Sequence, residues 1–235
     1  MNPVLILTRN NLELTKRCVE SVRAQDVETD VLVLDNDSTD GTVAWMDETL
    51  RERNTRNLGL MYEHPQIGVS AGWNKGLTQV FGYPRKADYC LVIGNDTVLA
   101  PWTYSALLSS DVSFVTGVDI GMNPLPEKPG VFPLSPHPDF SCFLIRRECW
   151  EKVGPFDERM VMYAQDCDYH VRAHRAGVPL WKASVPYQHE RSSTLNRATP
   201  EDRAAIHAQA NKDRAVFREL YGCTPGTPQY EDLFR

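Results

Sequence analysis

The sequence of 235 residues has none of the features that a membrane span or a secreted protein would show. No apolar run approaches the roughly 18 residues that a transmembrane helix needs. Its first residues, Met1-Asn2-Pro3, form no signal-peptide pattern and lead directly into an apolar stretch. There is no excess of positive charge, because 25 basic residues face 31 acidic ones, so no overall attraction to polyanions is expected. We therefore expect a soluble, cytoplasmic protein.

Two groups of motifs are also missing. The chain has no Gly-x-Gly-x-x-Gly and no Walker A sequence, which argues against a dinucleotide-dependent enzyme and a P-loop NTPase. Its six cysteines form no CxxC pair and no zinc-ribbon spacing, so they are expected to be reduced thiols. They are Cys18, Cys90, Cys142, Cys149, Cys167 and Cys223.

The first half of the chain alternates between strand-like and helix-like patterns. Apolar runs predict strands at residues 4–7, 31–34, 60–62, 89–93 and 112–118. Helical spacing is present between them, and Asn10 with Glu13 three residues later suggests a capping box. Strands and helices that alternate at this spacing predict βαβ units and a mostly parallel sheet.

The pattern changes after residue 118. Six prolines lie between Pro124 and Pro138, which excludes a helix or an interior strand and predicts a long functional loop. Strands are expected again at 140–145 and 180–185, with helices at 147–153 and 166–176. Thr199-Pro200-Glu201-Asp202 is a strong helix start, and the tail at 224–235 is expected to be an extended strap. One α/β domain is the simplest account of this order.

Polar, acid-bearing loops follow three of the predicted strands. They are Thr8-Arg9-Asn10, the segment from Asp35 to Gly41, and Gly94-Asn95-Asp96-Thr97. A single such acid would more often cap a helix or form a turn. Ligands of open α/β sheets bind beyond the carboxyl ends of the strands, so three such loops favour a polar ligand. If that ligand carries phosphates, Asp96 is the natural ligand for a bridging Mg²⁺ or Mn²⁺.

Histidines and aromatic residues give weaker signals. His170 and His174 are four residues apart on a predicted helix, where packing or surface roles are favoured over a metal site. His189 follows a strand and precedes a polar run, which favours a ligand role. Trp73 lies between Gly72 and Asn74 and is a candidate for stacking on a ligand, although core packing is the usual place for tryptophan.

The sequence resembles the family 2 glycosyltransferases. The segments that resemble the nucleotide-sugar half of that family are residues 4–10, 35–42, 68–76 and 91–97. Gly154-Pro155-Phe156-Asp157-Glu158, Gln165-Asp166-Cys167-Asp168 and residues 189–193 resemble the acceptor half. The resemblance implies a GT-A fold, which is a Rossmann-like three-layer αβα arrangement in a single domain. It also implies transfer of a sugar, with inversion, from a nucleoside diphosphate donor.

The resemblance assigns roles to particular residues. Asp166 would be the catalytic base, and Asp96 with His189 would hold Mn²⁺ or Mg²⁺. The family usually has Glu-Asp where this chain has Gln165-Asp166, and an acid where this chain has Gly94. Contacts to the nucleotide sugar would come from Thr8, Asp35, Asn36, Asp37, Asn74, Asn95 and Arg191.

The expected domain covers residues 1–222. Its nucleotide-sugar half would be about 1–118, its acceptor half about 119–195, and its last helix 199–222, before a tail at 223–235. A UDP- or dTDP-sugar is the favoured donor, whereas the acceptor is open among a glycan, a protein, a lipid-linked sugar and a modified nucleobase, with a soluble one favoured. Two alternatives are a nucleotidyltransferase, whose glycine- and lysine/arginine-rich loop is missing after Thr8, and a non-catalytic nucleotide-sugar-binding module.

Overall fold

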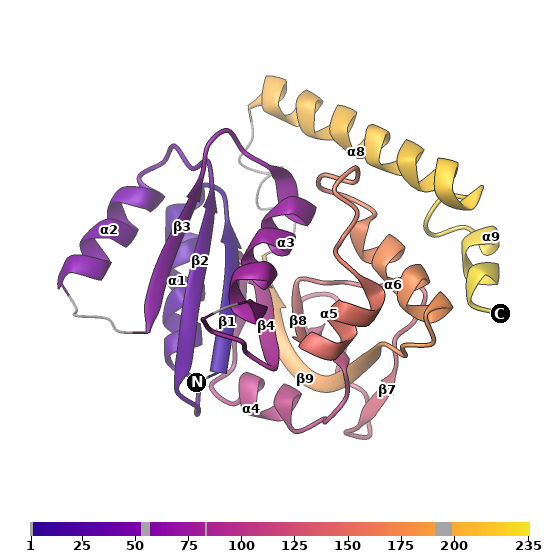
Figure 1. Ribbon diagram of the computed structural model, residues 1–235, viewed down its shortest axis with the longest axis horizontal. Helices are drawn as coiled ribbons and strands as arrows, with labels where there is room; N and C mark the ends of the chain where they lie inside the picture. Colours follow the sequence, from indigo (N-terminus) through magenta and orange to yellow (C-terminus); the bar gives the residue numbers. More distant parts are fainter. Residues whose placement is uncertain (1, 53–56, 83, 191–198) are drawn as a thin grey trace.

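A computed structural model of the protein describes residues 2–52, 57–82, 84–190 and 199–235 (Figure 1). The strands are β1 (Asn2–Thr8), β2 (Thr29–Asn36), β3 (Leu58–Glu63), β4 (Tyr89–Gly94), β5 (Thr97–Leu99), β6 (Phe114–Asp119), β7 (Val131–Pro133), β8 (Cys142–Arg146) and β9 (Trp181–His189). The helices are α1 (Leu12–Arg23), α2 (Thr42–Glu52), α3 (Gly68–Phe81), α4 (Thr103–Leu108), α5 (Arg147–Val153), α6 (Gln165–Arg175), α8 (Pro200–Tyr221), α9 (Pro228–Glu231) and the short 3₁₀ helix η1 (Asp232–Phe234).

The strands of the described residues form one nine-stranded sheet in the order β3-β2-β1-β4-β8-β6-β9-β5, with β7 paired to β9. The strands β1 to β4, β6 and β9 all run in the same direction, and β5, β7 and β8 run against them. The predicted mostly parallel sheet is thus confirmed. The parallel strands bring the loops after β1, β2 and β4 to one edge of the sheet, where the sequence predicted a ligand.

Both faces of the sheet are covered by helices. Leu5 and Leu7 of β1 pack into one buried cluster with α3, α5 and α6, whereas Val4 and Ile6 pack into another with α1, α2 and α4. This alternation follows from the period of two in a strand, and it accounts for the continuous apolar run that the sequence shows. Helix α3 lies very close to β1, because a Cβ on Gly72 would come within 2.7 Å of a Leu7 methyl carbon. The predicted three-layer αβα fold is confirmed.

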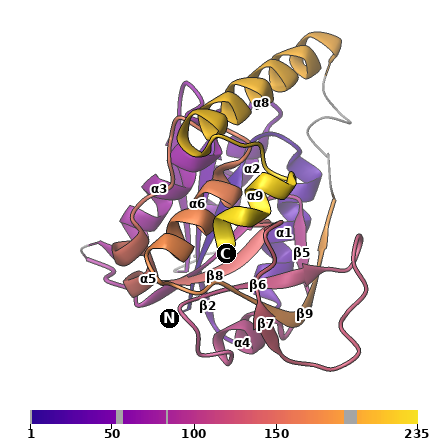
Figure 2. The same cartoon turned by 90° about the vertical axis from the view of Figure 1, so that its right-hand side faces the viewer.

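The last part of the chain adds a third buried cluster against α6. Phe217 of α8 and Tyr230 of α9 are fully buried there, next to Met160 and Val171. Figure 2 shows α8 and α9 on the α6 side of the molecule. The expected helix start is confirmed, because the Thr199 hydroxyl accepts a hydrogen bond from the Asp202 amide. No helix among the described segments is both long and apolar enough to cross a bilayer.

Some local predictions were wrong. Helix α1 begins at Leu12, and its N-cap is Asn11, which is left-handed with φ 62°. The predicted capping box at Asn10 does not form. Instead, the Leu12 amide donates a hydrogen bond to Asp40 of the neighbouring loop at 2.8 Å.

The tail is not an extended strap, because α9 and η1 form there around the buried Tyr230. The short strands β5 and β7 were not predicted. Strand β7 lies in the proline-rich loop and pairs only with β9, as expected for a proline-containing edge. All six cysteines are free, as expected.

Candidate active site

A cavity of about 420 Å³ lies at the carboxyl ends of β1 and β4 and reaches the start of α6. Its wall contains six of the residues that the sequence singled out: Thr8, Asn36, Asn95, Asp96, Asp166 and His189. Asp96 lies seventy residues before Asp166 in the chain and His189 lies 23 residues after it, yet the two metal-ligand candidates and the candidate base share one cavity. Such a cavity at the carboxyl ends of parallel strands is the usual place for a ligand in an open α/β sheet.

Asp96 and His189 are close neighbours in this cavity. The imidazole Nε2 of His189 lies 3.3 Å from Oδ1 of Asp96, and both side chains are mostly buried. Strand pairing accounts for the contact, because Thr97 of β5 pairs with His189 of β9. The pairing also places the turn after β4 next to the end of β9.

Ser141 determines which nitrogen of His189 faces Asp96. The Ser141 hydroxyl donates a short hydrogen bond to Oδ1 of Asp139, and it lies 3.0 Å from Nδ1 of His189. A hydroxyl has a single proton, and an ionised carboxylate only accepts, so the Ser141 oxygen must accept from Nδ1–H. We therefore assign a proton to Nδ1 of His189. When the imidazole is neutral, the lone pair of Nε2 is then directed to the side of Asp96.

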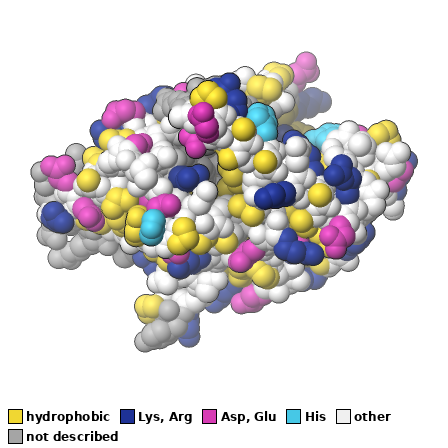
Figure 3. Space-filling model, turned by 90° about the horizontal axis from the view of Figure 1, so that it is seen from above, with side chains coloured by type: hydrophobic (Ala, Val, Ile, Leu, Met, Phe, Trp, Pro, Cys, Tyr) yellow, Lys and Arg dark blue, Asp and Glu magenta, His cyan; other side chains and the backbone are white. Residues whose placement is uncertain are grey.

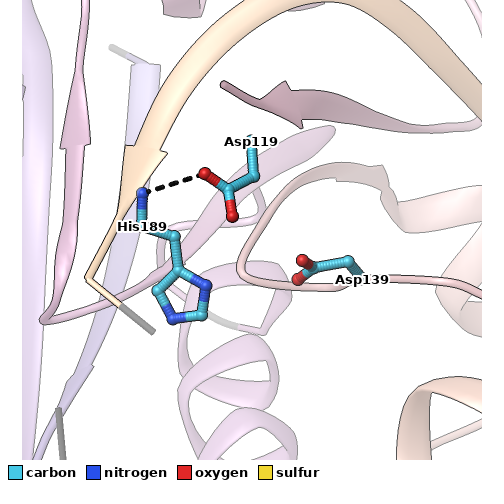
Figure 4. Close-up of side chains that lie close together, drawn as sticks. All are labelled: Asp119, Asp139 and His189. Atoms are coloured by element: carbon cyan, nitrogen blue, oxygen red, sulfur yellow. Dashed lines mark hydrogen bonds between the residues drawn. The ribbon is translucent and has the colours of Figure 1, made fainter. Parts of the chain in front are cut away.

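Two further acids surround His189, and neither of them was predicted from the sequence as a site residue. Asp119, Asp139 and His189 each place a possible ligand atom within 4.8 Å of the others. Figure 4 shows both carboxylates turned toward the imidazole, and the His189 amide donates to Oδ1 of Asp119 at 3.3 Å. Asp119 ends strand β6, so the rule applied to the other strand ends would have found it. Asp139 had no such signal, because only the fold of the proline-rich loop brings it here.

The donor chemistry of this region fits a divalent cation of the Mg²⁺ or Mn²⁺ type. Carboxylate oxygens suit both ions, and an imidazole nitrogen is acceptable to Mn²⁺. When the imidazole is neutral, Nε2 of His189 and Oδ1 of Asp96 face each other at 3.3 Å with lone pairs, and both would serve as ligands of a cation. Nδ1 of His189 is engaged by Ser141, which places Asp119 and Asp139 behind the imidazole as supporting groups.

Asp166 stands in the first turn of α6, where it is partly buried. Its Oδ1 accepts from the Cys167 amide at 2.8 Å. Burial raises the pKa of Asp166 to about 6, the Cys167 amide opposes that rise, and the negative charge of Asp139 adds to it. Ala164, two residues earlier, is the left-handed N-cap with φ 66°, and the helix begins at Gln165. A carboxylate with this pKa is ionised at neutral pH and still basic enough to accept a proton.

The predicted nucleoside contacts on the cavity wall are also well anchored. Thr8 shares a 2.9 Å hydrogen bond with Thr15, and the Asn36 carboxamide bonds to the backbone of Ile67 and Gly68. The Asn95 amide donates to the Asn10 carbonyl and to Thr15, both at 2.9 Å. These contacts fix the strand-end loops, so this part of the wall is formed before any ligand arrives.

The remaining predicted residues lie elsewhere. Asp35 is fully buried behind the wall, and its Oδ2 has no hydrogen-bond partner among the described residues. Asp37 pairs with His64 at 2.6 Å, which lowers the pKa of its carboxyl. The Asn74 carboxamide bonds to Phe156 and Glu158 and joins α3 to the turn after α5. Arg191 lies outside the described residues.

Trp73 and the two histidines of α6 behave mostly as packing residues. Trp73 lines the cavity, yet its ring packs against Phe143 and Phe156 at centroid distances of 5.3 and 5.0 Å. His170 is buried against Phe234 at 4.5 Å, and burial lowers its pKa to about 4. The expectation that His170 and His174 pack is consistent with these contacts, since both rings lie against Phe234.

The face of the molecule above the sheet carries charges of both signs. Figure 3 shows Lys and Arg side chains interspersed with Asp and Glu, and neither sign gathers into a continuous area on the side chains drawn. A surface of this kind gives no electrostatic basis for binding a long polyanion.

Comparison with known proteins gives a consistent result. Residues 4–110 match the model of glycosyl transferase family 2. The N-acetylglucosaminyl-diphospho-decaprenol L-rhamnosyltransferase of Mycobacterium tuberculosis is 35% identical over 68 residues. That match spans 28% of this chain and only 22% of the relative.

Solved structures share the fold over the whole chain. The mannosyltransferase PcManGT from Pyrobaculum calidifontis, in complex with GDP-Man and Mn²⁺, aligns with a TM-score of 0.66 and 18% identity over 99% of this chain and 67% of its own. GalNAc-T7 with UDP, GalNAc and Mn²⁺ aligns with a TM-score of 0.70 and 13% identity, over 99% of this chain and 53% of its own. TarS 1-349 of S. aureus in complex with UDP-GlcNAc aligns with a TM-score of 0.62 and 13% identity, over 100% of this chain and 78% of its own. The resemblance noted in the sequence is therefore confirmed: residues 4–110 match the model of glycosyl transferase family 2, and the fold of the chain is the GT-A fold.

Proposed function

We propose that this protein transfers a sugar from a nucleoside diphosphate sugar to an acceptor hydroxyl, with inversion at the anomeric carbon. One observation carries the proposal: Asp96, His189 and Asp166 line the same cavity of about 420 Å³. The candidate ion ligands and the candidate base are thus close enough to act on one bound donor. The family match over residues 4–110 supports the same reaction class.

Asp96 and Nε2 of His189 would hold the divalent cation. When bound, such a cation supplies positive charge that neutralises a departing diphosphate. Ser141 and Asp139 would keep a proton on Nδ1 of the imidazole, so that Nε2 is the nitrogen that binds the cation. Supporting hydrogen bonds of this kind orient a metal-binding histidine and raise its basicity.

Asp166 would act as the general base. Its carboxylate takes the proton of the acceptor hydroxyl while the hydroxyl oxygen forms a bond to the anomeric carbon. The bond from that carbon to the diphosphate breaks on the opposite side, and the nucleoside diphosphate leaves with the electron pair. Because one displacement occurs at one carbon, the configuration inverts. A pKa of about 6 supports this role, because the carboxylate is ionised at neutral pH and is a stronger base than an ordinary aspartate.

The donor would enter along the ends of β1 and β2. Thr8, Asn36 and Asn95 lie on the wall there, and Asp35, next to Asn36 in the chain, has a buried Oδ2 with no hydrogen-bond partner among the described residues. We propose Asp35 and Asp37 as further nucleoside contacts, and Arg191 as a diphosphate contact. UDP is present in the GalNAc-T7 structure and GDP-Man in that of PcManGT. A UDP- or dTDP-sugar is our first candidate, with GDP-mannose as the comparison.

We also propose a division of the domain into two halves. Residues 1–118 would bind the nucleotide sugar, and residues 119–195 would bind the acceptor and supply Asp166. The family match ends at residue 110, close to the proposed boundary. The acceptor is then bounded by the proline-rich loop and by α8, whose Ile206 reaches the cavity wall.

The test begins with thermal shift measurements of UDP-, dTDP- and GDP-sugars, with and without Mn²⁺. A ligand at one hundred times its Kd stabilises the folded state by about 2.7 kcal/mol, which gives a clear shift. The donor that binds is then followed for slow hydrolysis in wild-type protein and in Asp166→Asn. We expect donor binding to persist in the variant while turnover falls on the order of 10²- to 10⁴-fold.

Two outcomes contradict the proposal at different points. Turnover that survives in Asp166→Asn means that Asp166 is not the base. Donor binding without any turnover by the wild-type protein, with Mn²⁺ and a panel of hydroxyl acceptors, indicates a nucleotide-sugar-binding module instead.

A further inference from the structure

Helix α8 carries a fully buried carboxylate that faces the loop before α6. Asp213 has no exposed surface. Its Oδ2 accepts from the amides of Met162 and Tyr163, both at 2.9 Å, and its Oδ1 accepts from the Val161 amide at 3.1 Å. The Gln209 side chain, one turn earlier on α8, also donates to Oδ1 at 2.7 Å.

Burying a carboxylate is costly unless hydrogen bonds compensate for the lost water. Here three consecutive backbone amides, which belong to no helix or strand, supply that compensation. The same bonds satisfy amides that would otherwise need another acceptor. These three hydrogen bonds therefore hold residues 161–163 against α8, through a side chain that is about fifty residues away in the sequence.

The fixed segment lies against the cavity on its other side. Met162 and Tyr163 line the cavity, as do Gly68 and Val69 at the start of α3. The Val69 amide donates to the Val161 carbonyl at 2.6 Å, and a Cβ on Gly68 would come within 2.8 Å of that carbonyl oxygen. Residues 161–163 are thus held between α3 and Asp213.

The segment also leads directly into Asp166. Tyr163 is followed by the left-handed Ala164, and α6 starts at Gln165. Only two residues, Ala164 and Gln165, therefore lie between Tyr163, whose amide is the last that Asp213 holds, and the candidate base. A shift of residues 161–163 would move the first turn of α6 and admit water to it.

We propose that Asp213 is a positioning residue of the active site, which fixes residues 161–163 and thereby determines where the carboxylate of Asp166 stands. This inference rests on the proposed function only for its effect on sugar transfer. Its structural part, the coupling of Asp213 to the surroundings of Asp166, is measurable without any turnover.

A second contact between α8 and α6 provides a matched control. The Tyr221 hydroxyl donates to Oδ1 of Asp168 at 2.7 Å, and Oδ2 of Asp168 accepts from Arg172. Tyr221→Phe removes a buried hydrogen bond between the same two helices without touching residues 161–163. This variant therefore shows how far a weaker contact between α8 and α6 by itself changes the two measurements.

The experiment compares wild-type protein with Asp213→Asn, Asp213→Glu and Tyr221→Phe. Hydrogen exchange of the amides of residues 161–163 is the first measurement, and titration of the Asp166 carboxyl by ¹³C NMR is the second. The groups that face Asp166 are Asp139, the Cys167 thiol and amide, and Tyr230 of α9, and all of them are unchanged in these variants.

In Asp213→Asn we expect the protection of the backbone amides of residues 161–163 against hydrogen exchange to fall by about tenfold or more. The Asn side chain has one acceptor oxygen and cannot accept from all three backbone amides. The pKa of Asp166 should fall by about one unit as water reaches it. Asp213→Glu keeps the charge and should be intermediate, and it is the variant to measure if Asp213→Asn does not fold. Tyr221→Phe should lower the melting temperature by about 3 °C and leave both other measurements unchanged.

Transfer kinetics complete the test. Displacement of a base by about 1 Å can cost on the order of a hundredfold, so kcat should fall in Asp213→Asn while nucleotide affinity changes little. The inference is overturned if exchange and the Asp166 titration are unchanged in Asp213→Asn, or if Tyr221→Phe alters them equally. If both change as expected but no variant or wild-type protein transfers a sugar, the coupling stands and the proposed function alone fails.

Discussion

Nε2 of His189 and Oδ1 of Asp96 face each other at 3.3 Å across one side of the cavity, although 93 residues separate them in the chain. Because Ser141 engages the other nitrogen of His189, the two facing atoms both carry lone pairs when the imidazole is neutral. Two such atoms at this distance are stabilised by a cation between them. The arrangement is the structural basis of the predictions on metal dependence.

Replacing Asp96 by Ala should abolish the Mn²⁺-dependent part of donor binding, because one of the two facing ligands is lost. Isothermal titration of nucleotide sugar with and without Mn²⁺ measures this effect. Glu48→Gln on the exposed side of α2 is a matched control that also removes one negative charge. Should Asp119→Asn, rather than Asp96→Ala, remove the Mn²⁺ effect, the ion is held by the acids on the far side of His189.

Ser141→Ala should weaken Mn²⁺ binding by about ten- to a hundredfold, the usual cost of losing a supporting partner of a metal-binding histidine. Loss of the hydroxyl also frees Nδ1, so the ¹⁵N chemical shifts of His189 should show a mixture of tautomers in the metal-free protein. Ser109→Ala, at the exposed end of α4, is the control. A single, unchanged tautomer in Ser141→Ala would contradict our assignment of the hydrogen bonds.

The rate of transfer should depend on the ionisation of Asp166. Its pKa is raised to about 6, so the active, ionised form is lost as the pH falls below that value. We expect kcat/KM to fall about tenfold per pH unit below roughly pH 6, and to be level above it until another group titrates. A pH profile of transfer measures this, and a profile that falls only below pH 4 would exclude Asp166 as the essential base.

The same carboxyl should make the fold less stable at neutral pH. The pKa of Asp166 is about 6 when folded and near 3.9 when unfolded, so the folded protein holds this proton more tightly. The contribution of Asp166 to stability is therefore present below pH 4 and is lost as the pH rises to 6.

Asp166→Asn, which cannot ionise, should accordingly gain unfolding free energy relative to wild type as the pH rises from 4 to 6, up to about 3 kcal/mol, and keep that gain at pH 7. Urea denaturation at pH 4, 5, 6 and 7 measures the difference. His170, whose pKa is lowered to about 4, titrates in both proteins and cancels in the comparison. A constant difference across this range would show that the Asp166 pKa is not raised.

The strands and helices of the first half were predictable because their patterns are local. The buried runs of β1, β2 and β4 are continuous and β-branched, and such runs specify strands covered on both faces. The helix start at Thr199 was equally clear. The capping of α1 was not, since the Leu12 amide finds its acceptor in Asp40 of another loop, and no local pattern reports such a contact. The helical tail at 228–234 depends in the same way on burial of Tyr230 against α6.

The sequence by itself determined the order of strands and helices and the acids that end the strands, because periodicity and turn chemistry are properties of neighbouring residues. It pointed to Thr8, Asp96, His189 and Asp166, which the fold brings to one cavity. Only the tertiary structure decided that Asp119 and Asp139 surround His189, that the Asn74 carboxamide joins α3 to the turn after α5, and that Asp213 holds the loop before the candidate base. These relationships join segments many residues apart, and they arise from how the sheet, the proline-rich loop and α8 pack together.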